Sequence, residues 1–165
     1  MRQAIDINPT NYSARKLLAE LLVDTGRNAE AEALLLDGLE ILPGDGGFSM
    51  VLARLQVANG AKEEALSTLE QGMSSAGYDA EYHAFVAALL QDKGRHAEAI
   101  EHYIIALRSN PSMPDWLLGV GISLQAENKI NDAAAAFQRA IDTGELSVEV
   151  VQFANQQLKH IHQQF

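Results

Sequence analysis

The sequence predicts an all-α protein made of repeated helical hairpins. Its 165 residues are 47% hydrophobic and only 6% aromatic, with 4 prolines, a composition that favours helices over a β sandwich. Small side chains also recur with a period of 34 residues, which indicates places where two helices cross closely. They form two columns, namely Ala19, Ala53, Ala87 and Gly121, and then Ala31, Ala65, Ala99 and Ala133.

Two further columns divide each repeat into a first helix, a tight turn and a second helix. The turn column contains residue types that tolerate the left-handed backbone conformation found where a helix ends. Its members are Gly26, Gly60, Gly94 and Asn128. The other column closes the second helix and consists of Pro43, Gly77, Pro111 and Glu145. Large side chains keep the same period beside the small ones, so we expect them to fill the space between helices.

The helix starts follow the same register. The first helices are predicted to begin at Asn11, Asp45, Asp79, Met113 and Ser147. Four of these five side chains carry an oxygen that can accept hydrogen bonds from the first turn, and Pro114 suits the first helical position after Met113. The second helices open with Glu30, Glu64, Glu98 and Asp132. Because acidic groups stabilise the positive end of the helix dipole, we interpret this acidic column as structural.

The columns predict four complete repeats with a partial element on either side. The repeats are residues 11–44, 45–78, 79–112 and 113–146, which together span 11–146. Residues 1–10 are predicted to be the tail of a preceding repeat, so we expect the chain to be a fragment of a longer protein. Residues 147–165 are predicted to form a C-terminal solvating helix, because polar side chains are typical of a terminal repeat that faces water.

These columns resemble the signature of the tetratricopeptide repeat (TPR) family across nearly the whole chain. The resemblance implies a right-handed α-α superhelix of about four helix-turn-helix repeats plus a C-terminal capping helix. One departure is the fourth position of the signature, where the family often has a large residue. This chain has Arg15, Ser49, His83 and Leu117 there, and has Phe48, Tyr82 and Trp116 one residue earlier. We expect the shifted aromatic column to pack between adjacent first helices.

The resemblance also implies a concave groove lined by the first helices, where an extended or helical segment of a protein partner would bind. The residues predicted to face this groove are Lys16, Glu20, Met50, Arg54, Val57, Ala84, Ala88, Leu118, Ile122 and Gln125. An alternative for Leu118 and Ile122 is that the C-terminal helix covers them. The family's carboxylate clamp for chaperone tails is not expected, since Glu20 and Glu81 would repel a carboxylate.

Composition and residue spacing argue against several other functions. With 12 basic and 22 acidic residues, the net charge of −10 disfavours nucleic acid and anionic membranes, so no direct membrane contact is expected. The absence of cysteine excludes a thiolate metal site. His96 and His102 fall on different helix faces. Glu98 and His102 have the spacing of metal ligands, but the position of Glu98 at a helix start already explains this acidic residue. We therefore predict no catalytic, cofactor or metal site, and no enzyme.

The last third of the chain is similar to the MshN family, biogenesis proteins of the mannose-sensitive haemagglutinin (MSHA) type IV pilus. The residues that carry this resemblance are Trp116, Gly119, Gly121, Ile122, Ser123, Leu124, Ala126, Ala140, Gly144, Leu146, Ser147, Glu149, Phe153, Gln157 and Leu158. It implies a bacterial inner-membrane anchor before these repeats, a periplasmic location and a scaffold for the pilus machine. The alternative is a soluble cytosolic adaptor, or a homodimer formed through the open N-terminal end with Ile5 and Ile7 buried.

Overall fold

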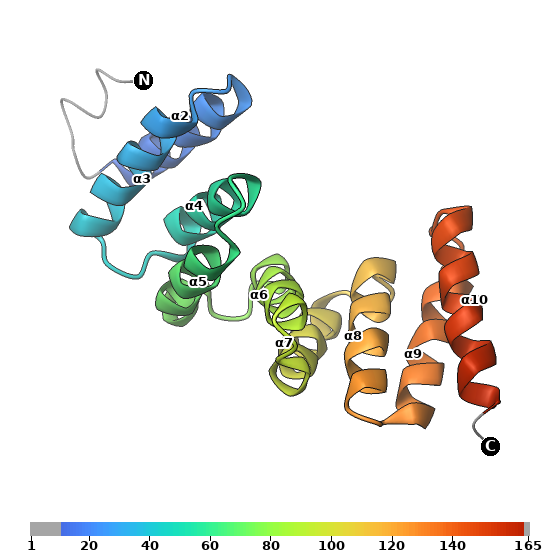
Figure 1. Ribbon diagram of the computed structural model, residues 1–165. Coiled ribbons are helices and arrows are strands. Elements are labelled where there is room, and N and C mark those ends of the chain that lie inside the picture. Colours follow the sequence, from blue (N-terminus) through green and yellow to red (C-terminus); the bar gives the residue numbers. More distant parts are fainter. Residues whose placement is uncertain (1–10, 164–165) are drawn as a thin grey trace. The chain divides into compact units, whose positions relative to one another are not determined.

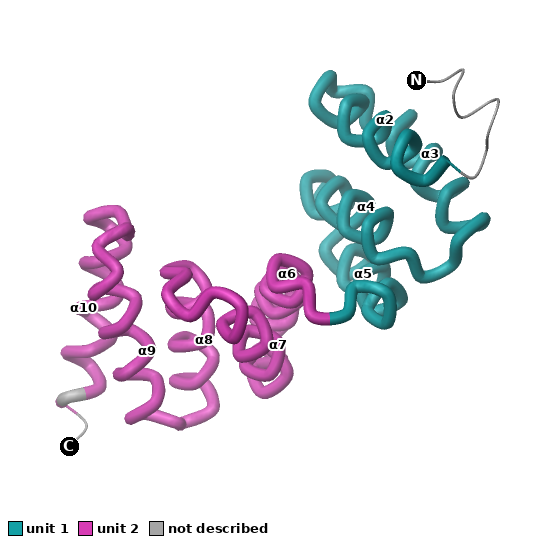
Figure 2. Tube along the Cα trace, turned by 180° about the vertical axis from the view of Figure 1, so that it is seen from behind, with its two compact units in different colours: residues 1–77 teal, residues 78–165 magenta. Residues whose placement is uncertain are grey.

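The computed structural model describes residues 11–163, and within that range every regular element is an α-helix. Helices are labelled from α2, as in Figure 1. The chain divides into two compact units, unit 1 up to Gly77 and unit 2 from Tyr78 onward, which Figure 2 colours separately. Within 11–163, no helix combines the length and the apolar composition needed to cross a membrane.

Unit 1 contains two helical hairpins. They are formed by α2 (Tyr12–Asp24) with α3 (Asn28–Ile41) and by α4 (Gly46–Ala58) with α5 (Lys62–Ala76). Two of the predicted capping residues act as caps here, because the Asn11 side chain accepts a hydrogen bond from the Ala14 amide and Asp45 accepts one from Phe48. The two hairpins join where α3 packs against α4.

Unit 2 contains two more hairpins and a final helix. They are α6 (Ala80–Asp92) with α7 (His96–Ser109), α8 (Pro114–Ala126) with α9 (Ile130–Asp142), and α10 (Val148–His162), which packs against α9. Asp79 and Ser147 cap α6 and α10 through their side chains. Met113 makes no such bond. Instead, α8 begins with Pro114, which has no amide hydrogen and therefore leaves no unpaired donor at the first helical position. The hairpins join where α7 packs against α8.

The turn column has the left-handed backbone that its residue types predict. Gly26, Gly60 and Gly94 have φ angles of 73°, 82° and 72°, and Asn128 takes φ 58°, alone among the non-glycine residues described. Gly77 differs, because its φ of 59° and ψ of −120° fall in a region that side chains exclude. A Cβ at Gly77 would nevertheless meet no heavy atom within 4 Å.

The core lies between the two helices of each hairpin and at the hairpin junctions. The alanines of both small columns have no exposed surface, and a Cβ at Gly121 would come within 2.9 Å of the Phe137 ring. Phe48 and Tyr82 of the shifted aromatic column are buried, while Trp116 is half-buried. The fourth-position residues are buried too, so the shifted aromatics pack beside that column without displacing it from the core. Its members are Arg15, Ser49, His83 and Leu117.

Candidate partner-binding surface

In unit 1, the predicted groove residues lie on α2 and α4. Lys16 and Arg54 are exposed, and Glu20 is half-exposed. The Lys16 ammonium lies 4.0 Å from the Glu20 carboxylate, in a solvated pair that contributes little to stability. Both charges can therefore turn toward a partner at small cost. Met50 and Val57 are half-buried and add apolar contact area beside them.

In unit 2, the predicted groove residues differ in how much surface they offer. Ala88 is exposed, while Ile122 and Gln125 are half-buried. Ala84 and Leu118 are each only 7% exposed. Leu118 belongs to a buried cluster that includes three residues of α10, and Ile122 packs against the same cluster. The burial of Leu118 agrees with the alternative that the C-terminal helix covers it. The binding role of all ten residues stays a prediction.

A histidine pair that the sequence analysis missed lies between α6 and α7. The Nδ1 atoms of His83 and His102 are 2.8 Å apart, so one ring donates a hydrogen bond and the other accepts it. His83 is buried. No sequence signal gave this contact, although the matching positions two repeats earlier are also in contact, since Arg15 donates to the Leu34 carbonyl. Within residues 11–163, no group of three or more His, Asp or Glu side chains is arranged to hold a metal ion.

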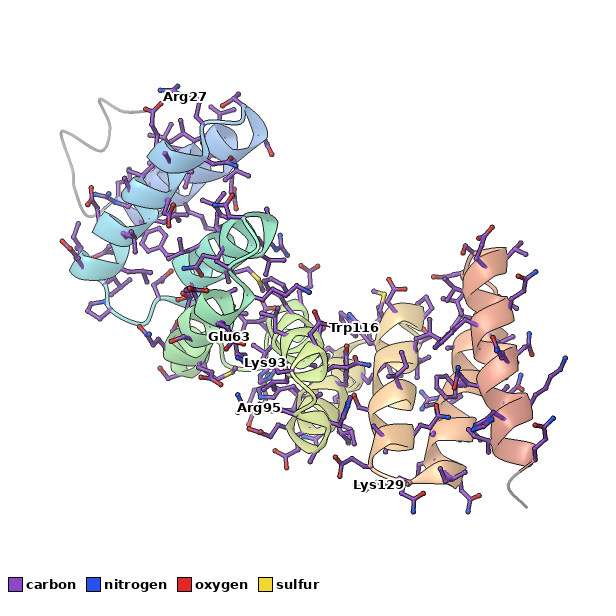
Figure 3. The ribbon with its side chains drawn as sticks, viewed as in Figure 1. Arg27, Glu63, Lys93, Arg95, Trp116 and Lys129 are labelled. Carbon is purple, nitrogen blue, oxygen red and sulfur yellow. The ribbon has the colours of Figure 1, made fainter. Side chains whose placement is uncertain are left out.

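Glu98, the acidic residue weighed as a metal ligand, takes part in an ion pair at the start of α7. Arg95 donates from Nε and Nη2 to the two carboxylate oxygens of Glu98, at 2.7 and 2.6 Å. This hydrogen bonding lowers the pKa of Glu98, and the matching bond between Arg27 and Glu30 raises the pKa of Arg27. Figure 3 labels both arginines. These exposed pairs belong to the helix starts, as the acidic column predicted.

Comparison with known families agrees with the 34-residue period. Two family models, both described as tetratricopeptide repeat, match residues 1–45 and 87–147, together more than half of the chain. The chain belongs to the tetratricopeptide repeat family. The predicted all-α TPR fold is thereby confirmed, with hairpins of the expected kind in both units. No curated protein sequence matches the chain.

Solved TPR structures are similar in fold. MamA from Desulfovibrio magneticus RS-1 is 12% identical with a TM-score of 0.77, over 93% of this chain and 90% of that chain. YrrB, described as a TPR protein with an unusual peptide-binding site, is 17% identical with a TM-score of 0.76, over 94% and 79%. Another MamA structure is 17% identical with a TM-score of 0.74, over 87% and 84%. At these identities the likeness concerns the fold.

Proposed function

We propose that this protein is a non-catalytic scaffold whose first helices hold a segment of a partner protein. The observation that carries the proposal is the mixed surface of α2 and α4, where Lys16 and Arg54 are exposed beside half-buried Met50 and Val57. Such a surface supplies apolar contact area and charges that orient a bound segment. TPR membership supports the same role, since repeats of this family commonly bind proteins or peptides.

We further propose that the scaffold acts in assembly of the MSHA type IV pilus, on the periplasmic side of a bacterial inner membrane. The support is the resemblance of the last third of the chain to the MshN family, over residues such as Trp116, Gly119, Gly121 and Phe153. The partner would then be a component of the pilus machine. A net charge of −10 favours a partner segment that is neutral or basic.

The proposal is tested by using the purified protein to capture partners from envelopes of piliated bacteria, followed by mass spectrometry. Pilus-assembly proteins should be enriched, and Arg54→Glu or Ala88→Glu should reduce their capture because both residues are exposed on the predicted groove. The matched controls are Arg108→Glu and Ala97→Glu, which make the same changes at exposed positions of α7. Recovery of cytosolic proteins alone would contradict the pilus assignment. Equal capture by all four variants would contradict the groove.

A homo-oligomerisation role is the second candidate. The predicted contact through Ile5 and Ile7 lies outside the described residues, but an apolar face on α2 favours the same role. Leu17 and Leu21 are 52% and 47% exposed, whereas their counterparts one repeat later, Val51 and Leu55, are 8% and 2% exposed. Val51 and Leu55 are buried in clusters with residues of the preceding hairpin. A helix of a second copy packed on α2 would bury Leu17 and Leu21 in the same way.

Light scattering tests this second role. A dimer that dissociates in Leu17→Glu or Leu21→Glu would support this role, because a carboxylate buried in the contact without an opposite charge would destabilise the dimer. The same change at exposed Leu36 on α3 is the control and should leave the dimer intact. A monomeric wild-type protein at high concentration would rule out homo-oligomerisation through this face.

A further inference from the structure

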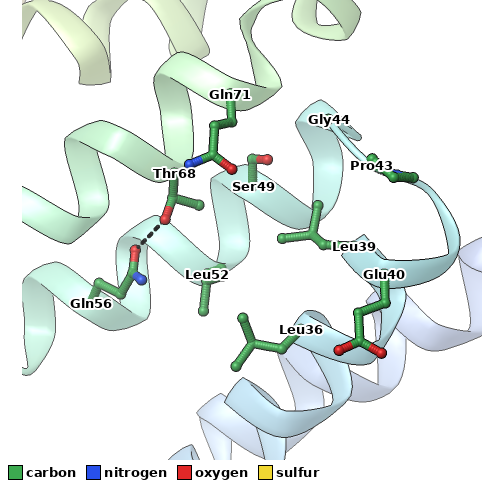
Figure 4. Close-up of a pocket in the computed structure, with 10 residues that line it drawn as sticks. All are labelled: Leu36, Leu39, Glu40, Pro43, Gly44, Ser49, Leu52, Gln56, Thr68 and Gln71. Carbon is green, nitrogen blue, oxygen red and sulfur yellow. Dashed lines mark hydrogen bonds between the residues drawn. The ribbon is translucent and has the colours of Figure 1, made fainter.

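Unit 1 contains a pocket on its second-helix side, away from the predicted groove residues. It has a volume of about 460 Å³ and is bounded by α3, α4, α5 and the turn between α3 and α4. Figure 4 shows Leu36, Leu39 and Leu52 on one side of the opening and Gln56, Thr68 and Gln71 on the other. This volume lies within the range of roughly 300–1,000 Å³ that is usual for pockets that hold small molecules.

The repeat register explains why this space is open. Its matching place in unit 2 is a smaller depression of about 350 Å³, with Leu117 where unit 1 has Ser49. There Arg139 donates a hydrogen bond of 2.8 Å to the Pro111 carbonyl, across the depression. The counterpart of Arg139 in unit 1 is Gln71, whose amide is directed to Ser67 of its own helix, at 3.4 Å. Unit 1 therefore lacks the leucine side chain and this arginine bridge.

The inner wall of the pocket carries an unsatisfied polar group. Ser49 is 1% exposed, and its hydroxyl has no hydrogen-bond partner, although buried hydroxyls normally have one. The other polar wall is already paired, since Thr68 donates to the Gln56 side chain at 2.9 Å. What remains for a ligand is a mixed lining, in which the leucines of α3 and α4 lie beside polar side chains of α4 and α5. A leucine-sized side chain fits this chemistry better than a charged group, which would lose its hydration there.

The surroundings of the pocket are acidic. Glu40 lies at its opening and is exposed. The two second helices of unit 1 add six more carboxylates against a single basic residue. These are Glu30, Glu32 and Asp37 on α3, and Glu63, Glu64 and Glu70 on α5, with Lys62 as the basic residue. Of these, Glu30 is already paired with Arg27, which precedes α3. This charge attracts a cationic segment and repels phosphate groups or an anionic lipid surface.

We propose that this pocket is a second docking site, which binds a cationic peptide segment by taking up one leucine-sized side chain. The apolar side chain enters between Leu36, Leu39 and Leu52, while a Lys or Arg beside it in the peptide faces Glu40. The site does not depend on the first-helix groove, because its α4 residues Ser49 and Leu52 lie on a different face of that helix from Met50 and Arg54. It would allow the scaffold to hold two partner segments at once.

The test uses the whole protein and three synthetic peptides of equal length, with methyl NMR of the leucines as the readout. The first peptide has a central Leu flanked by Gly and Lys, the second has Ala in place of Leu, and the third has Glu in place of Lys. The first should shift the methyl signals of Leu36, Leu39 and Leu52 and bind at least about tenfold more tightly than the others. A shift of equal size with the Ala peptide, or none at all, would overturn the proposal.

Variants that fill the pocket provide the decisive comparison. Ser49→Leu and Gln56→Leu each introduce the side chain that unit 2 has at the matching place, Leu117 or Leu124, so at least one should fold normally by circular dichroism. A filled pocket should abolish the difference between the Leu and Ala peptides. Glu40→Gln should weaken binding severalfold, whereas Glu127→Gln, an equal charge change in unit 2, should not. Unchanged binding by the folded filling variants would show that the peptide binds elsewhere.

Discussion

The junction between α3 and α4 in unit 1 and the junction between α7 and α8 in unit 2 have the same place in the repeat but differ in packing. In unit 2, Leu117 is buried and the Tyr103 ring lies so close to Gly119 that a Cβ there would overlap it. In unit 1 the corresponding residues are Ser49, Leu35 and Val51, and a pocket remains. The 34-residue signature therefore sets the position of helices, while a few side chains decide whether a junction is filled or open.

Leu117→Ser is the change with the largest expected effect, because it gives unit 2 the residue of unit 1. Removing this buried leucine should cost about 3–5 kcal/mol of unfolding free energy, the upper part of the range for Leu→Ala, since a hydroxyl is also buried. Urea unfolding followed by the fluorescence of Trp116, the single tryptophan and a residue of α8, measures this loss (Figure 3). A cost below about 1 kcal/mol would mean that the junction refills the space.

High pH should weaken unit 2 through Tyr103. Burial, followed by the charges of Asp92 and Asp115, raises the pKa of Tyr103 to about 12 from 10.0. Below pH 10 the Tyr103 phenol is neutral in both the folded and the unfolded state, so the folded protein keeps its full stability there. Part of this stability is lost between pH 10 and about 12, where the unfolded chain ionises first. The loss should reach roughly 2–3 kcal/mol.

Urea unfolding at a series of pH values, again with the Trp116 signal, measures this dependence. Tyr103→Phe is the matched control, because it keeps the ring but removes the group that titrates. It also removes the hydrogen bond of 3.0 Å to the Gln91 side chain, so its stability near neutral pH should be slightly lower. If wild type and Tyr103→Phe weaken equally above pH 10, the effect does not originate at Tyr103.

Gly119→Val should destabilise unit 2 by about 1–3 kcal/mol, because the added side chain would overlap the Tyr103 ring. Combining it with Tyr103→Leu restores the pair that unit 1 has at these places, Val51 and Leu35, and should recover part of the loss. Thermal unfolding of the two single variants and the double variant gives the coupling between the sites. Strictly additive effects would show that the two positions do not share one space.

Ser49→Leu should have the smallest effect and the opposite sign. Filling the pocket of unit 1 and removing an unpartnered buried hydroxyl should stabilise the protein by about 0.5–2 kcal/mol. The rise in the unfolding midpoint, measured by circular dichroism, tests this expectation. A lower midpoint would mean that Ser49 is held by tight packing and that the space beside it is not available to a larger side chain.

The sequence predicted features that depend on one helix and its register. The small columns, the helix starts at Asn11, Asp45, Asp79 and Ser147, and the left-handed turns follow from local chemistry, so a period of 34 was sufficient. It could not predict contacts whose partners lie on separate helices. The Nδ1 contact between His83 and His102 needs an inter-helix distance.

Two properties of individual sites also depended on three-dimensional packing. Ser49 was recognised as a departure from the signature, but whether its neighbours fill the missing volume depends on side chains from three helices. Leu118 shows the opposite case, since it occupies a groove position in the register and yet is buried in a cluster with residues of α10. The path of a terminal helix is not contained in the repeat, so the sequence left its two alternatives open.

The backbone of Gly77 predicts an unusual pattern of tolerated substitutions. This residue is exposed, and any added Cβ would meet open space, so a view based on contacts alone would allow every amino acid there. Its combination of φ 59° and ψ −120° nevertheless leaves glycine as the residue that enters it without strain. In a saturation mutagenesis survey, Gly77 should therefore be as intolerant as a core alanine, although its side-chain position faces only water.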